Sequence, residues 1–388
     1  MSRIIMYVYV NQKGAGELIY LDHAATTPVK EEVLAAMLPY FSNHFANASS
    51  VYSAARQSRK AIDAARCDIA GIIGAKTNEI YFTSGGSESD NWALMGTASA
   101  RPDKKHIITT KIEHHAVLHA CHALERRGFD VTYLDVDALG RVDAQCVDRA
   151  IRSDTLLVSV MLANNEVGTI EPVADIARVA HAHGVLMHTD AVQAVGHIPV
   201  DVGALGVDML SMSAHKFGGP KGCGALFVRS GTRIDNLIYG GAQERNMRAG
   251  TENVPAIVGM AKALTLSVQD MEMKSAKVRA LRDELEERLT HLGGVRINGD
   301  RSHRLPGHLH VSIDGCDTSL LLMRLDMAGI AASAGSACSS GAAERSHVMA
   351  AMGLSGENQA DIRFSLGTEN TREEIAAVEE AMRKILKR

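Results

Sequence analysis

Residues 211–220, Ser211-Met-Ser-Ala-His-Lys-Phe-Gly-Gly-Pro220, place one lysine, Lys216, between a strand-like run and a glycine turn. A second apolar run, residues 185–189, ends at Asp190 and is soon followed by Gln193. In an open α/β sheet, ligands bind at the carboxyl ends of the strands. The sequence therefore predicts that an amine, a carboxylate and an amide meet at one edge of a sheet.

These groups suit pyridoxal phosphate. Its pyridine nitrogen withdraws electrons while protonated, which calls for a buried carboxylate, and its aldehyde needs an amine. We expect Asp190 and Lys216 to be this pair. Taken singly, Asp190 could be a helix cap, Lys216 a surface charge and His215 a polar residue at a strand end. A nucleotide loop at Lys221 is excluded because no Ser or Thr follows that lysine.

The composition favours a small-molecule enzyme. The chain has 388 residues, enough for two domains, and a net charge of −4 with 22% charged residues of both signs interspersed. No concentration of charge indicates a nucleic-acid or membrane partner. Six scattered cysteines without a CxxC pair or zinc-like spacing indicate reduced thiols, no metal site and a cytoplasmic protein. The apolar run at residues 4–10 is too short to span a bilayer and is interpreted as a strand or a start-site extension.

Strand-like and helix-like stretches alternate from about residue 53 to residue 228, which predicts an α/β fold with a mostly parallel, doubly wound sheet covered by helices on both faces. We expect this large cofactor-binding domain to span residues 28–268. One long connecting helix is predicted to run to about Leu292. A smaller α+β domain would comprise residues 1–27 and 269–388, with strands at 294–298, 308–313 and 361–366.

Further polar stretches follow other predicted strands. Thr83-Ser-Gly-Gly-Ser-Glu-Ser-Asp90 has the glycines of a phosphate cup, with Ser87 as an added hydroxyl, but it would serve equally well as a helix start. In Lys111-Ile-Glu-His-His115 either histidine could stack on a planar cofactor or simply cap a helix. Asn164-Asn-Glu-Val-Gly168 could supply an amide or be an ordinary polar turn.

Two stretches near the carboxyl end complete the set. Arg363 alternates with Ile362 and Phe364, so it could hold a carboxylate in a two-pronged contact or lie in a surface salt bridge. Cys338 lies at the centre of residues 331–343, which are all Ala, Ser and Gly apart from this cysteine. That composition predicts a loop without firm packing and an exposed thiol, and an exposed thiol that ionises is a nucleophile.

As a set, these motifs resemble those of the NifS/IscS-like cysteine desulfurases, pyridoxal-phosphate enzymes of the class V aminotransferase group. The likeness extends from Tyr20-Leu-Asp-His-Ala-Ala-Thr-Thr-Pro28 to Arg363 and includes Gln243-Glu-Arg-Asn-Met-Arg-Ala-Gly-Thr251. It implies a fold-type I transferase that converts L-cysteine to L-alanine and leaves the sulfur on Cys338 as a persulfide. It also implies a homodimer with shared active sites and a sulfur-acceptor protein such as an iron-sulfur scaffold.

The resemblance also implies roles for single residues. Lys216 would carry the cofactor, with Asp190 at its pyridine nitrogen, Gln193 at its ring hydroxyl and His114 stacked on its ring. The phosphate would be held by Gly86, Ser87, Ser213 and His215, and by Thr251 from a neighbouring subunit. Asn165 and Arg363 would bind the substrate carboxylate.

Three other functions remain open from the sequence alone. A class V aminotransferase or a selenocysteine lyase would use Lys216, Asp190 and Arg363 equally well. An aminotransferase has no use for the Cys338 thiol, and a selenocysteine lyase could work without it. The chain could also be a cofactor-binding scaffold that has lost turnover, although it retains every expected catalytic position.

Overall fold

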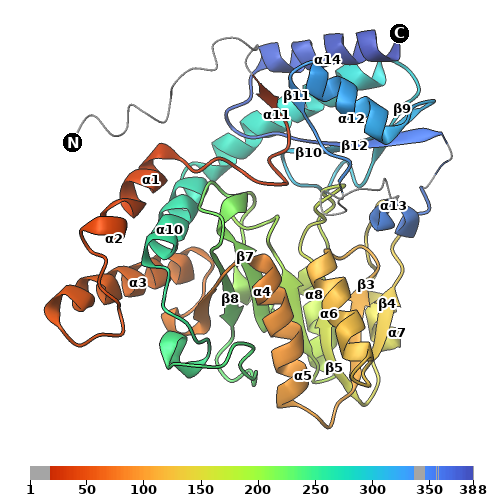
Figure 1. The fold of residues 1–388 in the computed structure, drawn as a ribbon. Coiled ribbons are helices and arrows are strands. Elements are labelled where there is room, and N and C mark those ends of the chain that lie inside the picture. Colours follow the sequence, from red (N-terminus) through yellow and green to blue (C-terminus); the bar gives the residue numbers. More distant parts are fainter. Residues whose placement is uncertain (1–17, 336–345, 355, 357, 388) are drawn as a thin grey trace.

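The computed structural model describes residues 18–335, 346–354, 356 and 358–387, and Figure 1 shows a large sheet with helices around it beneath a smaller body. The strands are β1 (Ile19–Tyr20), β2 (Ile80–Thr83), β3 (His106–Thr110), β4 (Asp130–Leu134), β5 (Thr155–Ser159), β6 (Leu186–Asp190), β7 (Met209–Ser213), β8 (Gly224–Val228), β9 (Val295–Asn298), β10 (His308–Asp314), β11 (Ile330–Ala331) and β12 (Gln359–Ser365).

The helices of the large body are α1 (Glu31–Met37), α2 (Pro39–Ser42), α3 (Ser53–Ile72), α4 (Gly86–Asn91), α5 (Thr97–Ala100), α6 (His115–Glu125), α7 (Ala144–Ala150), α8 (Val173–Ala182), α9 (Val202–Leu205) and α10 (Val254–Val268). A π-helical turn, Trp92–Gly96, joins α4 to α5. After α10 come α11 (Met271–Thr290), α12 (Thr318–Met327), α13 (His347–Ala351) and α14 (Arg372–Leu386).

The large sheet has the strand order β2-β8-β7-β6-β5-β3-β4. Strands β7, β6, β5, β3 and β4 pair in parallel, and β8 is antiparallel to both of its neighbours. The predicted mostly parallel, doubly wound sheet is therefore confirmed. Because the five parallel strands point the same way, their carboxyl ends share one edge, where the candidate residues follow β6 and β7.

Alternating side chains on the strands explain why helices cover both faces of this sheet. On β3, Ile108 belongs to the core shared with α3, α8 and α10, whereas the preceding Ile107 belongs to the core shared with α6 and the π-helical turn. Leu210 and Met209 on β7 divide in the same way. Each strand is apolar on both sides, which is the pattern that a doubly covered sheet requires.

The smaller body contains an antiparallel sheet of order β12-β10-β9 and a separate core formed with α11, α12 and α14. Leu21, which follows β1, belongs to this core, and β1 pairs in parallel with β11. The division of the chain at residues 27/28 and 268/269 stays a prediction.

The prediction of one connecting helix after Pro255 is wrong. Two helices, α10 and α11, are separated at Gln269 and Asp270, where Asp270 has a left-handed φ of 54°. The ammonium group of Lys274 donates to the carbonyls of Leu266 and Gln269, at 2.6 and 2.5 Å, so the exposed end of α10 is satisfied from the first turn of α11.

Part of the small-residue stretch is also packed more firmly than its composition predicted. Ala331 lies in β11, and the backbone of Ser333 exchanges hydrogen bonds with that of Arg363 on β12. Ser333 and Gly335 are buried. Pairing with β1 and β12 supplies the order that the side chains alone do not. Residues 336–345, including Cys338, lie outside the described residues.

Within the described residues, none of the helices is both long enough and apolar enough to cross a bilayer.

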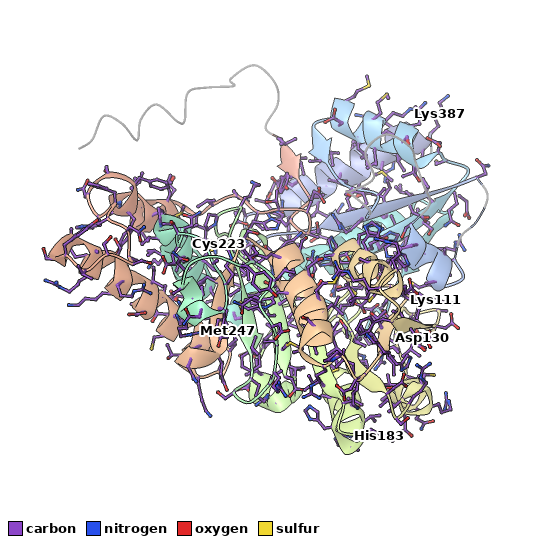
Figure 2. The ribbon with its side chains drawn as sticks, turned by 60° about the horizontal axis from the view of Figure 1, so that its bottom comes forward. Lys111, Asp130, His183, Cys223, Met247 and Lys387 are labelled. Carbon is purple, nitrogen blue, oxygen red and sulfur yellow. The ribbon has the colours of Figure 1, made fainter. Side chains whose placement is uncertain are left out.

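Five described cysteines are free, Cys67, Cys121, Cys146, Cys223 and Cys316. Burial raises the pKa of Cys121 and of Cys223 to about 12, and Figure 2 shows Cys223 beside the helices and strands of the large body. These two thiols stay protonated at neutral pH and are poor nucleophiles.

Candidate active site

The carboxyl ends of β6 and β7 bring Asp190 and Lys216 to one site. Asp190 is the last residue of β6, and its backbone pairs with Ser211 on β7. Lys216 lies three residues beyond β7, in a short 3-10 turn that spans Ala214–Lys216. Burial raises the pKa of Asp190, and the positive charge of Lys216 opposes that rise, so the two side chains interact electrostatically.

The segment before α1 holds the lysine in position. The Lys216 ammonium group donates to the carbonyls of Ala24 and Ala25, at 2.6 and 3.0 Å. Thr27 donates from its hydroxyl to the carbonyl of His215, and the Gly218 amide donates to the Thr27 hydroxyl. A segment nearly 190 residues earlier in the chain therefore forms one wall of the site.

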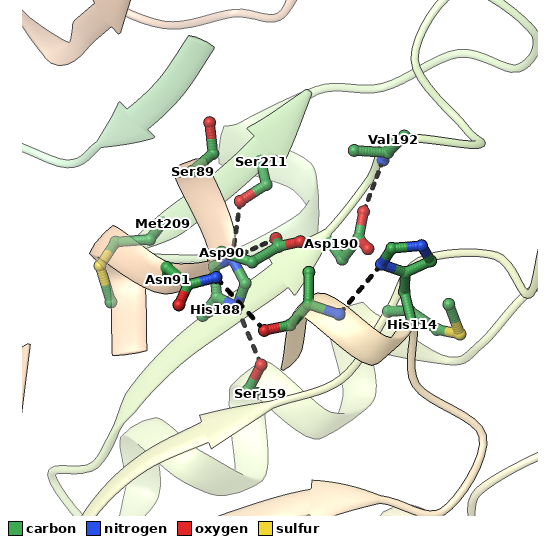
Figure 3. A network of polar contacts seen from close by, with 12 residues as sticks. Ser89, Asp90, Asn91, His114, Ser159, His188, Asp190, Val192, Met209 and Ser211 are labelled. Carbon is green, nitrogen blue, oxygen red and sulfur yellow. Dashed lines mark hydrogen bonds and ion pairs between the residues drawn. The ribbon is translucent and has the colours of Figure 1, made fainter. Parts of the chain in front are cut away.

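Asp190 is a buried carboxyl group with one close hydrogen bond, which it accepts from the Val192 amide at 2.8 Å. Burial raises its pKa to about 6, against the opposing effects of that amide and of Lys216. A second buried acid, Asp90 on α4, lies in the same network as Asp190 (Figure 3). Burial and the nearby Asp190 charge raise the pKa of Asp90 well above its usual range. Asp190 is therefore the member of the pair that ionises more readily.

Below Asp190, the buried His188 side chain lies between two hydroxyl groups, with Nδ1 2.9 Å from Ser159 Oγ and Nε2 3.0 Å from Ser211 Oγ (Figure 3). Burial lowers the pKa of His188 to about 3, so the ring is neutral. The floor of the site thus contains polar groups that carry little charge, which leaves Asp190 and Lys216 as its main charged pair.

The predicted phosphate cup forms a cavity of about 390 Å³ at the start of α4. Its lining includes the expected Gly86, Ser87, Ser213 and His215. A Cβ atom added at Gly86 would lie 2.6 Å from Val192 Cγ2, so the close packing of backbone and side chain requires glycine there. Gly85 is the residue before the helix and Ser87 lies within its first turn, so Ser87 is not the helix cap.

The charges around this cavity favour an anion. Glu88, the acidic residue of the first turn, receives two hydrogen bonds from Arg248, at 2.8 and 3.0 Å, and another from the Ser84 amide. Its negative charge is thereby neutralised, while Lys221 also lines the cavity. The free amides of a helix start and a nearby cation are the groups that bind phosphate in proteins.

A smaller cavity of about 100 Å³ is lined by Lys216 and by the predicted substrate-binding residues. It is lined by Ala24, Ala25, His114, His115, Asn165, Glu166, Gln193, Lys216, Gly335, His347 and Arg363. The amide of Gln193 donates to the Ala24 carbonyl at 3.0 Å. Residues from both bodies of the protein therefore meet around one small space.

His114 is both a helix cap and a cavity residue. Its Nδ1 accepts a hydrogen bond from the Ala116 amide at 3.1 Å at the start of α6. Burial and the charge of Lys216 lower its pKa to about 4. The ring is consequently neutral with its proton on Nε2, a form suited to stacking on a planar group.

Arg363 is buried, with 2% of its surface exposed, so the alternative of a surface salt bridge is wrong. Nη2 donates to Asp22 Oδ1 at 2.7 Å, and Nη1 donates to the carbonyls of Asn165 and Gly335. Among the described residues, Nε has no hydrogen-bond partner. Ile362 and Phe364 point into the core of the smaller body, as the alternation predicted. The Nε–H group of this buried cation is thus left without a partner in the described part of the chain.

Among the described site residues that the sequence predicted, Asp190 and Thr251 line neither cavity. Thr251 is exposed and lies outside the lining of both cavities, so it contributes nothing to the site of its own chain. Cys338 lies outside the described residues, although Gly335, three residues before it, lines the smaller cavity. Residues that the sequence did not single out are Asp22 and Glu166, both inside quoted motifs. Their proximity to Arg363 depends on the packing of β12 against distant segments.

A model of the aminotransferase class-V family matches residues 19–378. The chain belongs to this family. A cysteine desulfurase IscS of Methanosarcina thermophila is 49% identical over 380 residues, which cover 97% of this chain and 94% of the relative. A putative cysteine desulfurase IscS 1 of Bacillus subtilis is 49% identical over 378 residues, covering 96% of this chain and 99% of that protein.

Solved structures agree with this family assignment. A NifS-like protein superposes with a TM-score of 0.91 at 38% identity, covering 95% of this chain and 99% of that protein. The structure described as SspA in complex with cysteine has a TM-score of 0.80 at 38% identity, with 91% of this chain and all of that protein covered. The predicted fold-type I architecture of this chain is therefore confirmed across nearly its whole length.

Proposed function

We propose that this chain is a pyridoxal-phosphate-dependent cysteine desulfurase, with Lys216, Asp190 and Cys338 as its central residues. It would convert L-cysteine to L-alanine and hold the sulfur on Cys338 as a persulfide. The observation that carries the proposal is the pairing of a buried carboxyl, Asp190, with the Lys216 amine at the carboxyl edge of the sheet. Relatives named cysteine desulfurase, 49% identical over nearly the whole chain, support the reaction.

The residues present fit the cofactor. The cavity at Gly86, Ser87, Ser213 and His215 offers amides and hydroxyls to a phosphate. Asp190 offers an ionisable carboxyl group to the pyridine nitrogen, and the flat imidazole of His114 lines the same space as Lys216. When bound, pyridoxal phosphate supplies an electron sink that makes the α-proton of an amino acid removable.

The chain's own residues would orient the substrate and move its protons. Arg363 and Asn165 would hold the substrate carboxylate, because both residues line the smaller cavity and Arg363 Nε has no partner among the described residues. Lys216, released from the cofactor, would be the base that removes the α-proton. The thiolate of Cys338 would attack the substrate sulfur, which places the persulfide on the protein.

The thiol of Cys338 separates this proposal from the two related enzymes. A class V aminotransferase would need Lys216, Asp190 and Arg363 but no nucleophilic thiol, and a selenocysteine lyase could act without one. The relatives reported above carry the name cysteine desulfurase rather than either alternative. A scaffold without turnover is disfavoured because the described part of the site brings together its amine, its acid and its guanidinium.

A homodimer is part of the proposal. Large apolar side chains are exposed around the start of α3, among them Phe45 at 75% and Val51 at 93%. Arg59 on α3 forms an ion pair with Glu252, next to Thr251, so this apolar surface and Thr251 lie on the same side. Exposed apolar patches of this kind mark interfaces. A second copy of the chain would cover them and receive Thr251 at its phosphate cavity.

The remaining partners follow from the reaction. The persulfide would pass to a sulfur-acceptor protein such as an iron-sulfur scaffold. We place the enzyme in the cytoplasm, which suits the free thiols of its five described cysteines.

Borohydride reduction of the protein with pyridoxal phosphate, followed by peptide mapping, tests the cofactor assignment. We expect the pyridoxyl group on Lys216 and none on Lys221, which lines only the phosphate cavity. A Lys216→Ala protein should take up no label. Labelling of Lys221, or equal labelling of the variant, would contradict the assignment.

A further inference from the structure

Glu166 is a buried acid in the wall of the smaller cavity, and the proposed desulfurase mechanism assigns it no role. Only 1% of its surface is exposed, and it lines the same space as Lys216, His114 and Arg363. Its backbone is fixed within the Asn164–Gly168 turn, because the Asn164 side chain accepts a hydrogen bond from the Glu166 amide at 2.9 Å. The backbone position from which the Glu166 side chain extends is therefore fixed beside the smaller cavity.

The orientation of the carboxyl group is set by Ser346. The Ser346 hydroxyl accepts hydrogen bonds from the amides of Val348 and Met349 at the start of α13. Its own proton is then free to be donated to Glu166 Oε2, which lies at 2.5 Å. Within the described chain, the other oxygen, Oε1, has no hydrogen-bond partner. One oxygen is anchored and the other is buried without a partner, in a residue that lines the cavity.

The protonation of Glu166 suits proton transfer near neutral pH. Burial raises its pKa to about 7, and the Ser346 hydrogen bond and the charge of Arg363 oppose that rise. The histidines of the same cavity differ: the pKa of His114 is lowered to about 4, and burial also lowers the pKa of His115 and of His347. An acid with a pKa close to the working pH is an efficient proton donor.

We propose that Glu166 is the general acid that delivers a proton to the β-carbon of the substrate. This inference depends on the proposed desulfurase reaction. The Cys338 thiolate forms a bond to the substrate sulfur, the bond between that sulfur and the β-carbon breaks, and its electron pair stays with carbon. The sulfur keeps its own hydrogen as the persulfide. The β-carbon then takes the proton of Glu166 and becomes the methyl group of alanine, and Glu166 regains a proton from water.

The neighbouring Glu171 supplies a matched control. It is also a buried glutamate, with 3% of its surface exposed, one anchored oxygen and one oxygen without a partner among the described residues. Burial raises its pKa to about 8. Glu171 does not line the cavity, so a substitution there tests the effect of removing a buried acid without removing one from the site.

The test compares Glu166→Gln with Glu171→Gln in the cofactor-loaded protein. For Glu166→Gln, alanine formation should fall about 100-fold or more, the lower end of what general acid catalysis contributes. The change in visible absorbance on adding L-cysteine should persist, because the glutamine still fills the space and the cofactor site is intact. Glu171→Gln should keep the wild-type rate. A Glu166→Gln protein with the wild-type rate would overturn the proposal, and so would one that loses the absorbance change.

A cofactor-free readout tests the same residue independently. In infrared titrations of the protein without pyridoxal phosphate, the wild type should show a carboxylic-acid band that disappears near pH 7 and that Glu166→Gln lacks. Absence of any such difference would contradict the proposal. If the wild-type protein forms no alanine at all, the proposed function fails, whereas an active wild type with an equally active Glu166→Gln protein rejects only the role of Glu166.

Ser346→Ala separates proton donation from a purely structural role. Loss of the Ser346 hydrogen bond removes a group that stabilises the ionised carboxylate, so the pKa of Glu166 should rise. A general acid acts while protonated, and its activity is lost as the pH rises through its pKa. The basic limb of the pH profile for alanine formation should therefore move to higher pH in Ser346→Ala. An unmoved limb, or one that moves down, would contradict the assignment.

Discussion

Arg363 Nη2 lies 2.7 Å from Asp22 Oδ1, and this ion pair joins β12 to the segment that follows β1. The guanidinium is also held by the carbonyls of Asn165 and Gly335. Three segments far apart in the sequence thus fix one buried cation before any substrate arrives. A cation with a fixed orientation loses little conformational freedom on binding a carboxylate, which favours affinity.

Arg363→Lys should raise KM for L-cysteine about tenfold or more while changing kcat less. Lysine carries one ammonium group and cannot contact Asp22 and the two carbonyls while presenting a further planar N–H to the substrate. Steady-state kinetics with L-cysteine measures the effect, and a loss of tenfold in affinity corresponds to about 1.4 kcal/mol. An unchanged KM would show that the substrate carboxylate is bound elsewhere.

Gly86→Ala should weaken the binding of pyridoxal phosphate about tenfold or more. The added methyl group would lie 2.6 Å from Val192 Cγ2, and the Val192 amide donates a hydrogen bond to the Asp190 carboxyl group. The substitution therefore disturbs both the phosphate cavity and the acid. Gly71→Ala in α3 is the control, because its added methyl group has no neighbour within 4 Å. Absorbance titration with the cofactor measures both variants, and equal affinities would contradict the assignment of the cavity.

Glu171→Gln should reduce the pH dependence of stability between about pH 4 and pH 8. Burial raises the pKa of Glu171 to about 8, so the folded protein holds a proton that the unfolded chain has released in this window. The contribution of Glu171 to the free energy of unfolding is therefore greatest at low pH. It is lost as the pH rises, by up to ~1.4 kcal/mol per pH unit. Thermal unfolding across this range should show a flatter profile in Glu171→Gln than in the wild type or in Glu31→Gln, an exposed control on α1. Identical slopes would refute the prediction.

Arg66→Ala should destabilise the protein by ~3–5 kcal/mol, the range for one partner removed from a buried pair. Arg66 and Glu244 are buried and make two parallel hydrogen bonds, at 2.7 and 2.8 Å. Glu244 also accepts from the Phe82 amide and has a left-handed φ of 45°, so this pair holds the segment that leads to Thr251. Chemical denaturation measures the loss. Arg56→Ala, on the exposed face of the same helix, should cost far less.

Local patterns in the sequence were enough to predict the sheet and the residues at its edge. The apolar runs before Asp190 and Lys216 became β6 and β7, and adjacent parallel strands bring their carboxyl ends together. Local patterns also indicated the glycine turn at Gly86, which lines a cavity, and the alternation that places Arg363 on a strand opposite two core residues.

Contacts between distant segments could not be predicted in the same way. The Asp22–Arg363 pair joins residues 341 positions apart, and the Glu166–Ser346 bond joins residues 180 apart. Neither Asp22 nor Glu166 differs in its local pattern from an ordinary turn residue. The break between α10 and α11 was missed because Lys274 satisfies the carbonyls of α10 without a glycine or proline to mark the end.

The central claim is that the chain desulfurates L-cysteine through a persulfide on Cys338. Release of alanine and sulfide from L-cysteine, with pyridoxal phosphate and a reductant, should be measured for the wild type and for Cys338→Ala. We expect equal amounts of the two products from the wild type and neither from the variant. Undiminished release by Cys338→Ala would contradict the persulfide mechanism and favour direct lyase chemistry.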